Sequence, residues 1–138
     1  MDLLNSPSFH MLEKSMDAAA LRQKVIANNI ANVDTPFFKK SRVVFEDILR
    51  QQMISQNQPA FRGYRTHERH IPIPGGELQP LEPQIVQDQF TLMNNNMNNV
   101  DIDYEMSLMS KNVLRYNLLT SQVNHEIGML RTAIGGRV

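Results

Sequence analysis

Two of the four histidines have a spacing that could serve a metal ion. His67 and His70 stand three residues apart, but no third ligand lies at a characteristic distance from them in the sequence. They sit in a proline-bounded loop, where a solvated or packed histidine pair is the commoner outcome. His10 and His125 are isolated within helical patterns. We therefore predict no metal site and no cofactor.

Carboxylates supply a second set of candidates for chemistry. Asp101 and Asp103 resemble the start of a calcium loop, but the central glycine and the distant glutamate of that loop are missing. Capping of a helix explains the two aspartates better. Asp101 with Glu105, or Asp103 with Glu126, would make an acid pair, yet nothing places either pair in a cleft. The chain also lacks a glycine-rich phosphate loop and a nucleophile-elbow motif, so we expect neither an enzyme nor a small-molecule substrate.

The overall charge argues against a nucleic-acid partner. Fourteen basic and fourteen acidic residues give a net charge of zero, whereas phosphate binding depends on a clustered positive face. The short basic cluster Lys39, Lys40 and Arg42 is too small to change this. The chain has no cysteine, and we expect no membrane-spanning segment and no Sec-type signal peptide at its N-terminus.

Helical periodicity dominates the two ends of the chain. A first helix is expected from Ser6 to Val33, with Ser6 as N-cap and Pro7 as the first helical residue. Its apolar positions repeat every three and four residues, as in a coiled-coil seam, with Gln23 as the one polar member. A polar seam residue usually lowers stability and helps to fix register. The apolar seam residues include Phe9, Leu12, Met16, Ala19, Ile26, Ile30 and Val33.

A second and longer helix is expected from about Asp103 to Ile134. Acidic residues near its start suit the helix dipole, and Gly135 and Gly136 mark its end. Its seam alternates spacings of four and three throughout, with Thr120 as the weak position. The seam consists of Ile102, Met106, Met109, Val113, Tyr116, Thr120, Val123, Ile127, Leu130 and Ile134.

The middle of the chain, residues 35–99, reads as an irregular insertion. It contains six of the seven prolines, and five of the six residues at 94–99 are asparagine. An apolar patch at 43–49 predicts a strand leading into a helical turn, and a short β-hairpin fits this region. The fold class is therefore mainly α: residues 1–34 and 100–138 form two terminal coiled-coil helices around the 35–99 insertion.

Five apolar residues lie off the two seams and suggest a role in assembly. A two-helix hairpin would leave them facing water, which is normal for scattered leucines. The sharper interpretation is that helices of other copies cover them, and a head-to-tail contact that does not close would build a filament. These residues are Leu21, Val25, Leu108, Leu114 and Leu118.

Three asparagines are unusual in the first helix, because asparagine is a poor helix former. Asn29 borders the seam, while Asn28 and Asn32 point away from it. We interpret all three as hydrogen-bonding groups for neighbouring subunits. Alternatively, Asn32 ends the helix by adopting a left-handed backbone, with Asp34, Thr35 and Pro36 preventing continuation.

Both ends of the chain resemble one family. The stretch "ANNIANVDTP" at 27–36 is similar to the N-terminal signature of bacterial flagellar rod and hook proteins. The stretch "NNVDIDYEMSLMSKNVLRYNLLTSQVN" at 98–124 resembles their closing helix. The short length, "THERHIP" at 66–72, and Asn112 followed by Leu114, Arg115 and Tyr116 are most similar to the proximal-rod members. Alternatives are another short rod protein or a generic coiled-coil adaptor.

The resemblance implies an axial structural subunit. Terminal helices of such proteins form the inner layer of a helical tube that surrounds the export channel and transmits torque. Implied partners are further copies, other rod proteins, the adaptor FliE, and the membrane ring and export gate. The implied location is the basal body, with the rod in the periplasmic space, reached by flagellar type III export without a cleaved signal.

Two further expectations come with the resemblance. Phe45 and Leu49 match a short motif of early export substrates, although the same pair could simply anchor a small core. Many relatives carry glycine after the Thr-Pro pair, where this chain has Phe37. Since phenylalanine resists a positive φ, we expect the turn after the first helix to differ.

Overall fold

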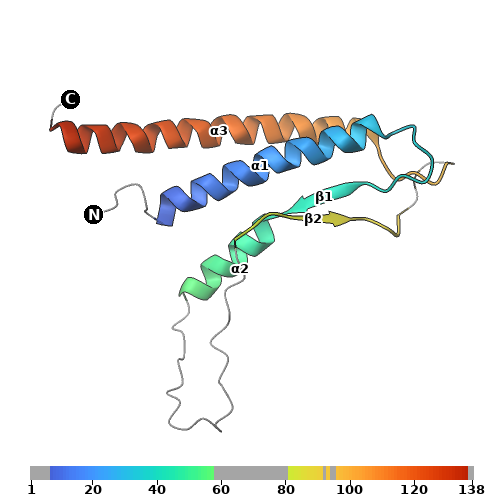
Figure 1. The fold of residues 1–138 in the computed structure, drawn as a ribbon, viewed down its shortest axis with the longest axis horizontal. Coiled ribbons are helices and arrows are strands. Elements are labelled where there is room, and N and C mark those ends of the chain that lie inside the picture. Colours follow the sequence, from blue (N-terminus) through green and yellow to red (C-terminus); the bar gives the residue numbers. More distant parts are fainter. Residues whose placement is uncertain (1–6, 58–80, 92, 94–95, 137–138) are drawn as a thin grey trace, which may run out of the picture.

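The computed structural model describes residues 7–57, 81–91, 93 and 96–136. Two long helices lie side by side and antiparallel: α1 (Pro7–Ala31) and α3 (Ile102–Gly135). They are closest where α1 ends and α3 begins, and they diverge toward the other end (Figure 1). Between them in the sequence come β1 (Ser41–Val44), α2 (Glu46–Asn57) and β2 (Gln84–Gln87). The expected mainly helical fold is confirmed.

The ends of the helices have identifiable local causes. Helix α1 begins at Pro7, as predicted, because proline suits a position that needs no N–H donor. The side chain of Asp101 accepts hydrogen bonds from the backbone N–H groups of Asp103 and Tyr104 at the start of α3. Gly136 ends α3 with φ 62°, and its N–H donates to the Thr132 carbonyl at 3.0 Å. The capping explanation of Asp101 is therefore confirmed.

The described parts of the middle, residues 35–57 and 81–91, contain more regular structure than the sequence indicated. Strands β1 and β2 pair antiparallel, with Ser41 opposite Gln87 and Val44 opposite Gln84. The strand at 43–44 does lead into a helix, but this helix, α2, runs for 12 residues. The polar stretch from Arg50 onward was expected to be irregular, and this was wrong as far as Asn57. The first turn of α2 carries Glu46 and Asp47, whose negative charges are favourable at the N-terminal end of the helix dipole.

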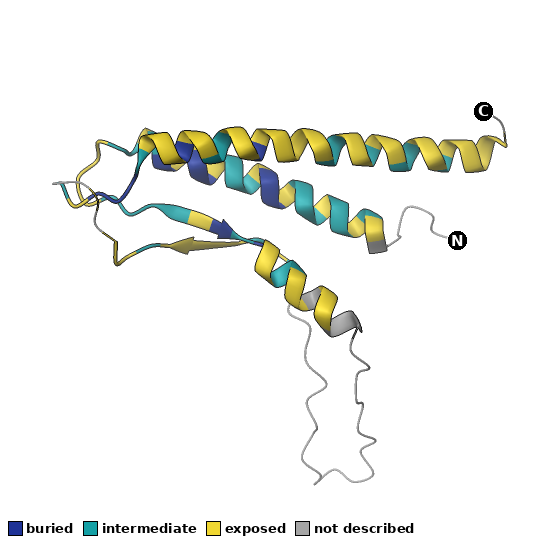
Figure 2. Ribbon diagram, turned by 180° about the vertical axis from the view of Figure 1, so that it is seen from behind, coloured by how far each residue is buried: buried dark blue, intermediate teal, exposed yellow. Residues whose placement is uncertain are grey.

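The apolar core is small and lies at one end of the molecule. It forms where α1, β1 and the segment entering α3 meet, and the buried positions gather there (Figure 2). Among the described residues, those at the opposite end, where α1 begins and α3 ends, contribute nothing to the core. The core consists of Ala18, Ala19, Val25, Ile26, Val43, Phe45 and Val100.

Candidate assembly surface

Asn29 connects the end of α1 to the start of the sheet. Its side chain is 1% exposed. Its Nδ2 donates to the Ser41 carbonyl at 2.8 Å and to Glu105 Oε2 at 3.1 Å, while its Oδ1 accepts the Ser41 N–H at 3.0 Å. The amide thus pairs with Ser41 as a neighbouring strand would. This differs from the expected contact with another subunit, because the amide already has its partners inside the chain.

Asn98 closes the C-terminal end of α1 from a distant part of the sequence. It is fully buried, and its Nδ2 is shared among the carbonyls of Asn32, Val33 and Thr35 at 2.9, 2.9 and 3.0 Å. Its Oδ1 accepts the N–H of Val100 at 2.7 Å. Two of these carbonyls also accept backbone N–H groups of the turn, Asn32 from Thr35 and Thr35 from Phe38. Asn98 therefore ties the turn after α1 to the segment entering α3 and thereby holds the two long helices together.

Asn99 performs a similar task for the sheet. Its Oδ1 accepts the N–H of Lys40 at 2.7 Å, and its Nδ2 donates to the Asp88 carbonyl at 3.0 Å and to Thr91 Oγ1 at 2.8 Å. The Thr91 hydroxyl in turn donates to Asp88 Oδ2 at 2.8 Å. This hydrogen bond is the main reason that the pKa of Asp88 lies below its ordinary value. One buried amide therefore links the start of β1 to the residues that follow β2.

The turn after α1 contains a strained residue. Phe37 has φ 61° and its side chain is 71% exposed, while its N–H donates to the Asn96 carbonyl at 3.0 Å. We expected phenylalanine to avoid this conformation, and the structure shows instead that it adopts the backbone glycine would favour. Among the described non-glycine residues, positive φ occurs at Phe37 and Met97, so the alternative of a left-handed Asn32 is wrong.

A three-residue ion cluster attaches α2 to both long helices. Arg22 of α1 binds Glu46 through contacts of 2.8 and 2.7 Å, and Arg115 of α3 binds the same carboxylate. Burial raises the pKa of Glu46, but its own backbone N–H and the two arginines outweigh this, so the pKa is lowered. Because about half of the Glu46 side chain is exposed, solvent weakens these attractions.

The polar seam residue Gln23 has a partner across the helix interface. Asn112 of α3 donates through Nδ2 to the Ala19 carbonyl at 2.9 Å and to Gln23 Oε1 at 3.1 Å. Asn112 is 4% exposed, and its Oδ1 is buried without a hydrogen-bond partner among the described residues. A slip of one helical turn would separate this pair, so it specifies the register of α1 against α3.

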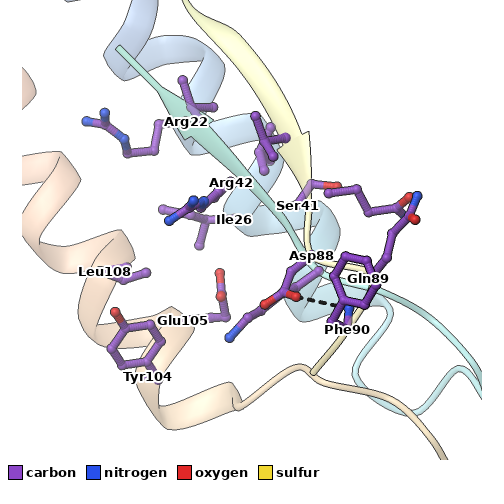
Figure 3. A pocket seen from close by; sticks show the side chains of 15 residues that line it. Arg22, Ile26, Ser41, Arg42, Asp88, Gln89, Phe90, Tyr104, Glu105 and Leu108 are labelled. Carbon is purple, nitrogen blue, oxygen red and sulfur yellow. Dashed lines mark hydrogen bonds between the residues drawn. The ribbon is translucent and has the colours of Figure 1, made fainter. Parts of the chain in front are cut away.

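A cavity of about 630 Å³ opens between the sheet and the two long helices. Ile26 and Leu108 contribute to its apolar lining, whereas Arg42, Tyr104 and Glu105 bring polar groups toward the hollow (Figure 3). The buried carboxylate of Glu105 is already bonded to Asn29. No described residue completes an acid pair, an activated nucleophile or a metal set around it.

The face of α3 that meets α1 is displaced by one residue from the predicted seam. Glu105 and Asn112 are the buried residues of α3, whereas the seam residues Met106 and Val113 are 53% and 44% exposed. Tyr116 and Ile134 are exposed as well. One residue corresponds to about 100° around a helix. Among the other seam residues, Ile26 of α1 is buried. The half-buried ones are Leu12, Met16 and Ile30 of α1 and Met109, Val123, Ile127 and Leu130 of α3.

The off-seam residues separate into two groups. Leu114 and Leu118 are 70% and 69% exposed and form an outward-facing pair on α3. Val25, by contrast, is 8% exposed because β1 covers this side of α1. Leu21 and Leu108 are half-buried. The sequence did not show that a sheet would cover part of α1, so Val25 belongs to the core of the chain.

Asn28 and Asn32 remain at the surface of α1. Asn28 is exposed and Asn32 half-buried. Asn32 Nδ2 donates to the Asn28 carbonyl at 2.8 Å, and Asn32 Oδ1 accepts from the Thr35 hydroxyl at 3.2 Å. Asn32 thus bonds within the turn that ends the helix, while the Asn28 side chain faces outward.

The remaining sequence candidates are the histidine pair and the residues of the export motif. His67 and His70 fall outside the described residues. Within the part of the chain that the structure does describe, no three histidine, aspartate or glutamate side chains come together as metal ligands. None of the described helices has the length and apolarity needed to cross a bilayer. Phe45 is 3% exposed, and Leu49, one turn into α2, is half-buried.

The sequence patterns did not reveal the polar residues that connect the end of α1 and the sheet to the start of α3. Asn98 and Asn99 belong to an asparagine run whose composition predicts turns, yet both are buried side chains with several partners. The sequence pattern indicates only helix capping or an acid pair for Glu105. The polar residues at 98–105 show no periodic pattern. Their partners lie in other segments of the chain, so local patterns could not reveal these contacts.

Comparison with known proteins places the chain among flagellar components. A family described as "Flagella basal body rod protein" matches residues 12–39. A protein of Borreliella burgdorferi named "Flagellar basal body rod protein FlgB" is 36% identical over 80% of this chain and 82% of its own length. Proteins of the same name in Bacillus subtilis and Borrelia hermsii are 32% and 37% identical, over 96% and 86% of this chain and 97% and 89% of their own lengths.

These similarities extend well beyond the N-terminal signature. The Bacillus subtilis alignment includes nearly the whole chain, and thus the segment with Asn98 and Asn99 as well as both long helices. Identity above 30% over such a length places both the signature helix and the closing helix in one family. The chain therefore belongs to the FlgB family of flagellar basal body rod proteins.

Proposed function

We propose that this protein is a structural subunit of the proximal rod of the bacterial flagellum. Copies assemble helically with other rod proteins into the hollow shaft that transmits torque. In this proposal residues 1–34 and 100–138 form the inner coiled-coil layer, and residues 35–99 form an insertion outside it. The subunit is not an enzyme, and no cofactor takes part in its work.

One observation carries the proposal beyond family membership: the heptad stripe of α3 that α1 leaves open. Ile102, Met106, Val113 and Tyr116 are 44%, 53%, 44% and 40% exposed, although their spacing is that of a helix-packing seam. A seam of this period suits another helix. A contiguous exposed apolar surface is also uncommon on a protein that works as a monomer. The stripe supports contact with the helix of a neighbouring subunit.

Leu114 and Leu118 add a second apolar surface on the side of α3 away from α1. Two separate apolar faces on one helix allow each copy to contact different neighbours, as a helical array requires. Asn28, which is exposed on α1, is a candidate for hydrogen bonding at such contacts. These residues are our candidates for the assembly surface.

The proposed location and partners follow from the family. The subunit would lie at the rod base in the periplasmic space, beside other rod proteins, the adaptor FliE, and the ring and export gate. It would arrive by type III export without a cleaved signal. Phe45 is buried in the folded chain, so a receptor that reads Phe45 and Leu49 would meet them only before folding.

Deletion of the gene tests this function. We expect loss of motility and basal bodies that lack a rod, both restored by the wild-type gene. As a matched pair, the variant L114S/L118S should fail to restore motility, whereas S107A/S110A on the same helix should restore it. A motile deletion strain would overturn the proposal and favour the runner-up, a generic coiled-coil adaptor.

A further inference from the structure

A groove runs along the side of α3 that faces the sheet and the start of α2. Its first part is the cavity of about 630 Å³ between the sheet and the two long helices, where Tyr104 and Leu108 face Arg42 of β1 (Figure 3). A second cavity of about 230 Å³ forms the rest. Both cavities are lined by Arg22, Val43 and Leu108, so they are continuous. We call the two together the α3 groove.

The wall that α3 contributes has the spacing of a helix-packing surface. Four of its lining residues follow one another at intervals of four, three and four, namely Tyr104, Leu108, Lys111 and Arg115. One helix packs against another with this period. The distance from Tyr104 to Arg115 corresponds to about 16 Å of helix, or about three turns. The groove therefore suits a short helix laid along α3.

The floor of the α3 groove is apolar and belongs to the core. Val25 and Ile26 of α1 and Val43 of β1 line it, and they are 8%, 3% and 9% exposed. A floor built from packed core residues needs little rearrangement when it binds. An occupant must present an apolar face to it.

The sides of the α3 groove carry an excess of positive charge. Five of its lining side chains are cationic and three are anionic. Each carboxylate already has a partner within the chain: two arginines for Glu46, Asn29 for Glu105 and Thr91 for Asp88. Arg42 and Lys111 are exposed, and neither forms an ion pair within the part of the chain that the structure describes. The charge left over is positive and favours an acidic occupant.

A buried acceptor in the second cavity lacks a donor. Asn112 lines this cavity and is 4% exposed, and its Oδ1 has no hydrogen-bond partner among the described residues. Its Nδ2 is held by the Ala19 carbonyl and Gln23 Oε1, which fixes the orientation of the amide. A buried oxygen without a donor lowers stability. An occupant that brings an N–H or O–H group to this oxygen would remove that penalty.

The chain itself offers no free acidic helix for this groove among its described elements. Helix α1 carries two acidic and three basic residues, and α3 carries three of each. In α2, Glu46 is already part of the groove wall. Residues 58–80 contain three arginines and two glutamates, so their charge does not complement the groove either. Charge complementarity therefore points to a different protein rather than to a second copy.

We propose that the α3 groove binds an acidic amphipathic helix of a different protein. The apolar face of that helix lies on the floor of the groove, its carboxylates meet Arg42 and Lys111, and a donor group reaches Asn112 Oδ1. The groove is separate from the surface formed by Leu114 and Leu118. The inference thus goes beyond the proposed rod function, because it concerns a second kind of partner and not contacts among copies.

Fluorescence anisotropy with the purified full chain tests the groove. The probe is a fluorescein-labelled synthetic amphipathic helix made of leucine, glutamine and glutamate. One matched probe has lysine in place of glutamate, and another has the acidic composition in an order without an apolar stripe. We expect the acidic amphipathic helix to bind, with an affinity that falls as salt is added, and the other two probes not to bind.

Charge-reversal variants locate the binding. R42E/K111E should lower the affinity for the acidic helix at least about tenfold, because two attractive charges become repulsive, and R42Q/K111Q should lower it less. The matched control K24E/R131E makes the same change of charge at exposed positions outside the groove and should bind as wild type does. Circular dichroism checks that all three variants are folded.

Each outcome decides the proposal. Equal binding of the acidic and lysine probes, or unchanged affinity of R42E/K111E, would overturn it. If the acidic helix fails to bind and R42E/K111E instead loses self-association in sedimentation, the occupant is a second copy and the proposal is likewise overturned. Deletion of the gene tests the rod function separately, so failure of one is distinguishable from failure of the other.

Discussion

Buried asparagines, rather than large apolar residues, connect the segments of this protein. Asn29, Asn98, Asn99 and Asn112 are each less than 5% exposed, and each bonds to a segment that another element contributes. An amide offers both donors and an acceptor, so one side chain can replace several missing backbone partners. Removing a buried amide leaves those groups without partners, which costs more than the hydrogen bond itself contributes.

We expect Asn98→Ala to lower the free energy of unfolding by about 2–3 kcal/mol, because the substitution removes four hydrogen bonds made by a fully buried amide. Urea denaturation followed by circular dichroism measures the change. Asn28→Ala is the matched control, since Asn28 is exposed and alanine favours helix. Equal effects of the two substitutions would contradict the capping role of Asn98.

The Glu46 cluster predicts a dependence of stability on pH. The folded state lowers the pKa of Glu46 below its ordinary value of 4.5, so the ionised carboxylate stabilises the fold above that pH. This contribution is lost as the pH falls through the lowered pKa. Denaturation curves between pH 6 and about 3 should show a steeper loss for wild type than for Glu46→Gln. Parallel curves would exclude the cluster as a cause.

At the scale of elements, α3 is unevenly supported. Its buried residues, Glu105 and Asn112, lie in the first third of the helix, while the last turns extend past α1. A helix receives most of its stability from packing rather than from intrinsic propensity. The two ends of α3 therefore differ in stability although the sequence pattern is continuous.

Hydrogen exchange should show this difference along α3. We expect the amides of residues 105–116 to exchange more slowly than those of residues 121–134 in the free subunit, because local opening is easier where few side chains are buried. Mass spectrometry of peptides from each half measures the rates. Assembly should slow exchange in the second half most, and uniform protection in the free subunit would contradict this expectation.

The sheet depends on one buried aromatic residue. Phe45 lies between β1 and α2 and is 3% exposed. Phe45→Ala should lower the free energy of unfolding by about 3–5 kcal/mol, since it removes apolar contacts and leaves a cavity. Leu49→Ala, at a half-buried position, should cost less. Thermal denaturation of both variants measures the difference, and the reverse order would contradict the anchoring role of Phe45.

At the scale of the whole molecule, the exposed apolar surface exceeds what the fold requires. The open stripe of α3 and the pair Leu114 and Leu118 lie outside the core, as do the exposed side chains of Phe37 and Phe90. They point in different directions, as contacts in a helical array must. The core of the described residues is small for the length of α1 and α3, which supports the proposal that neighbouring subunits complete the packing.

The variant L114S/L118S tests this at the level of association. We expect its free energy of unfolding to stay within about 0.5 kcal/mol of wild type, because both side chains are exposed in the free subunit. Its self-association, measured by sedimentation at increasing concentration, should weaken. A variant that unfolds at lower urea concentration with unchanged association would assign the leucines to the fold instead.

Local sequence patterns were enough to predict the two long helices, the start of α1 at Pro7, both caps of α3 and the polar seam residue Gln23. These are local or periodic features: Pro7, Asp101 and Gly136 act on neighbouring backbone groups, and the heptad spacing marks a packing face. The same locality explains why the family could be named from two short stretches of the chain.

Which face of α3 meets α1, and what covers α1, depend on contacts between segments that are distant in the sequence. Periodicity defines a stripe but not the rotation of the helix about its axis; here Glu105 and Asn112 take the inner face because Asn29 and Ala19 offer them partners. The sequence pattern places Val25 on the outside, because a sheet formed by residues about forty positions apart leaves no local signal. Buried asparagines were likewise unpredictable, since an amide reveals its partner only once distant segments are brought together.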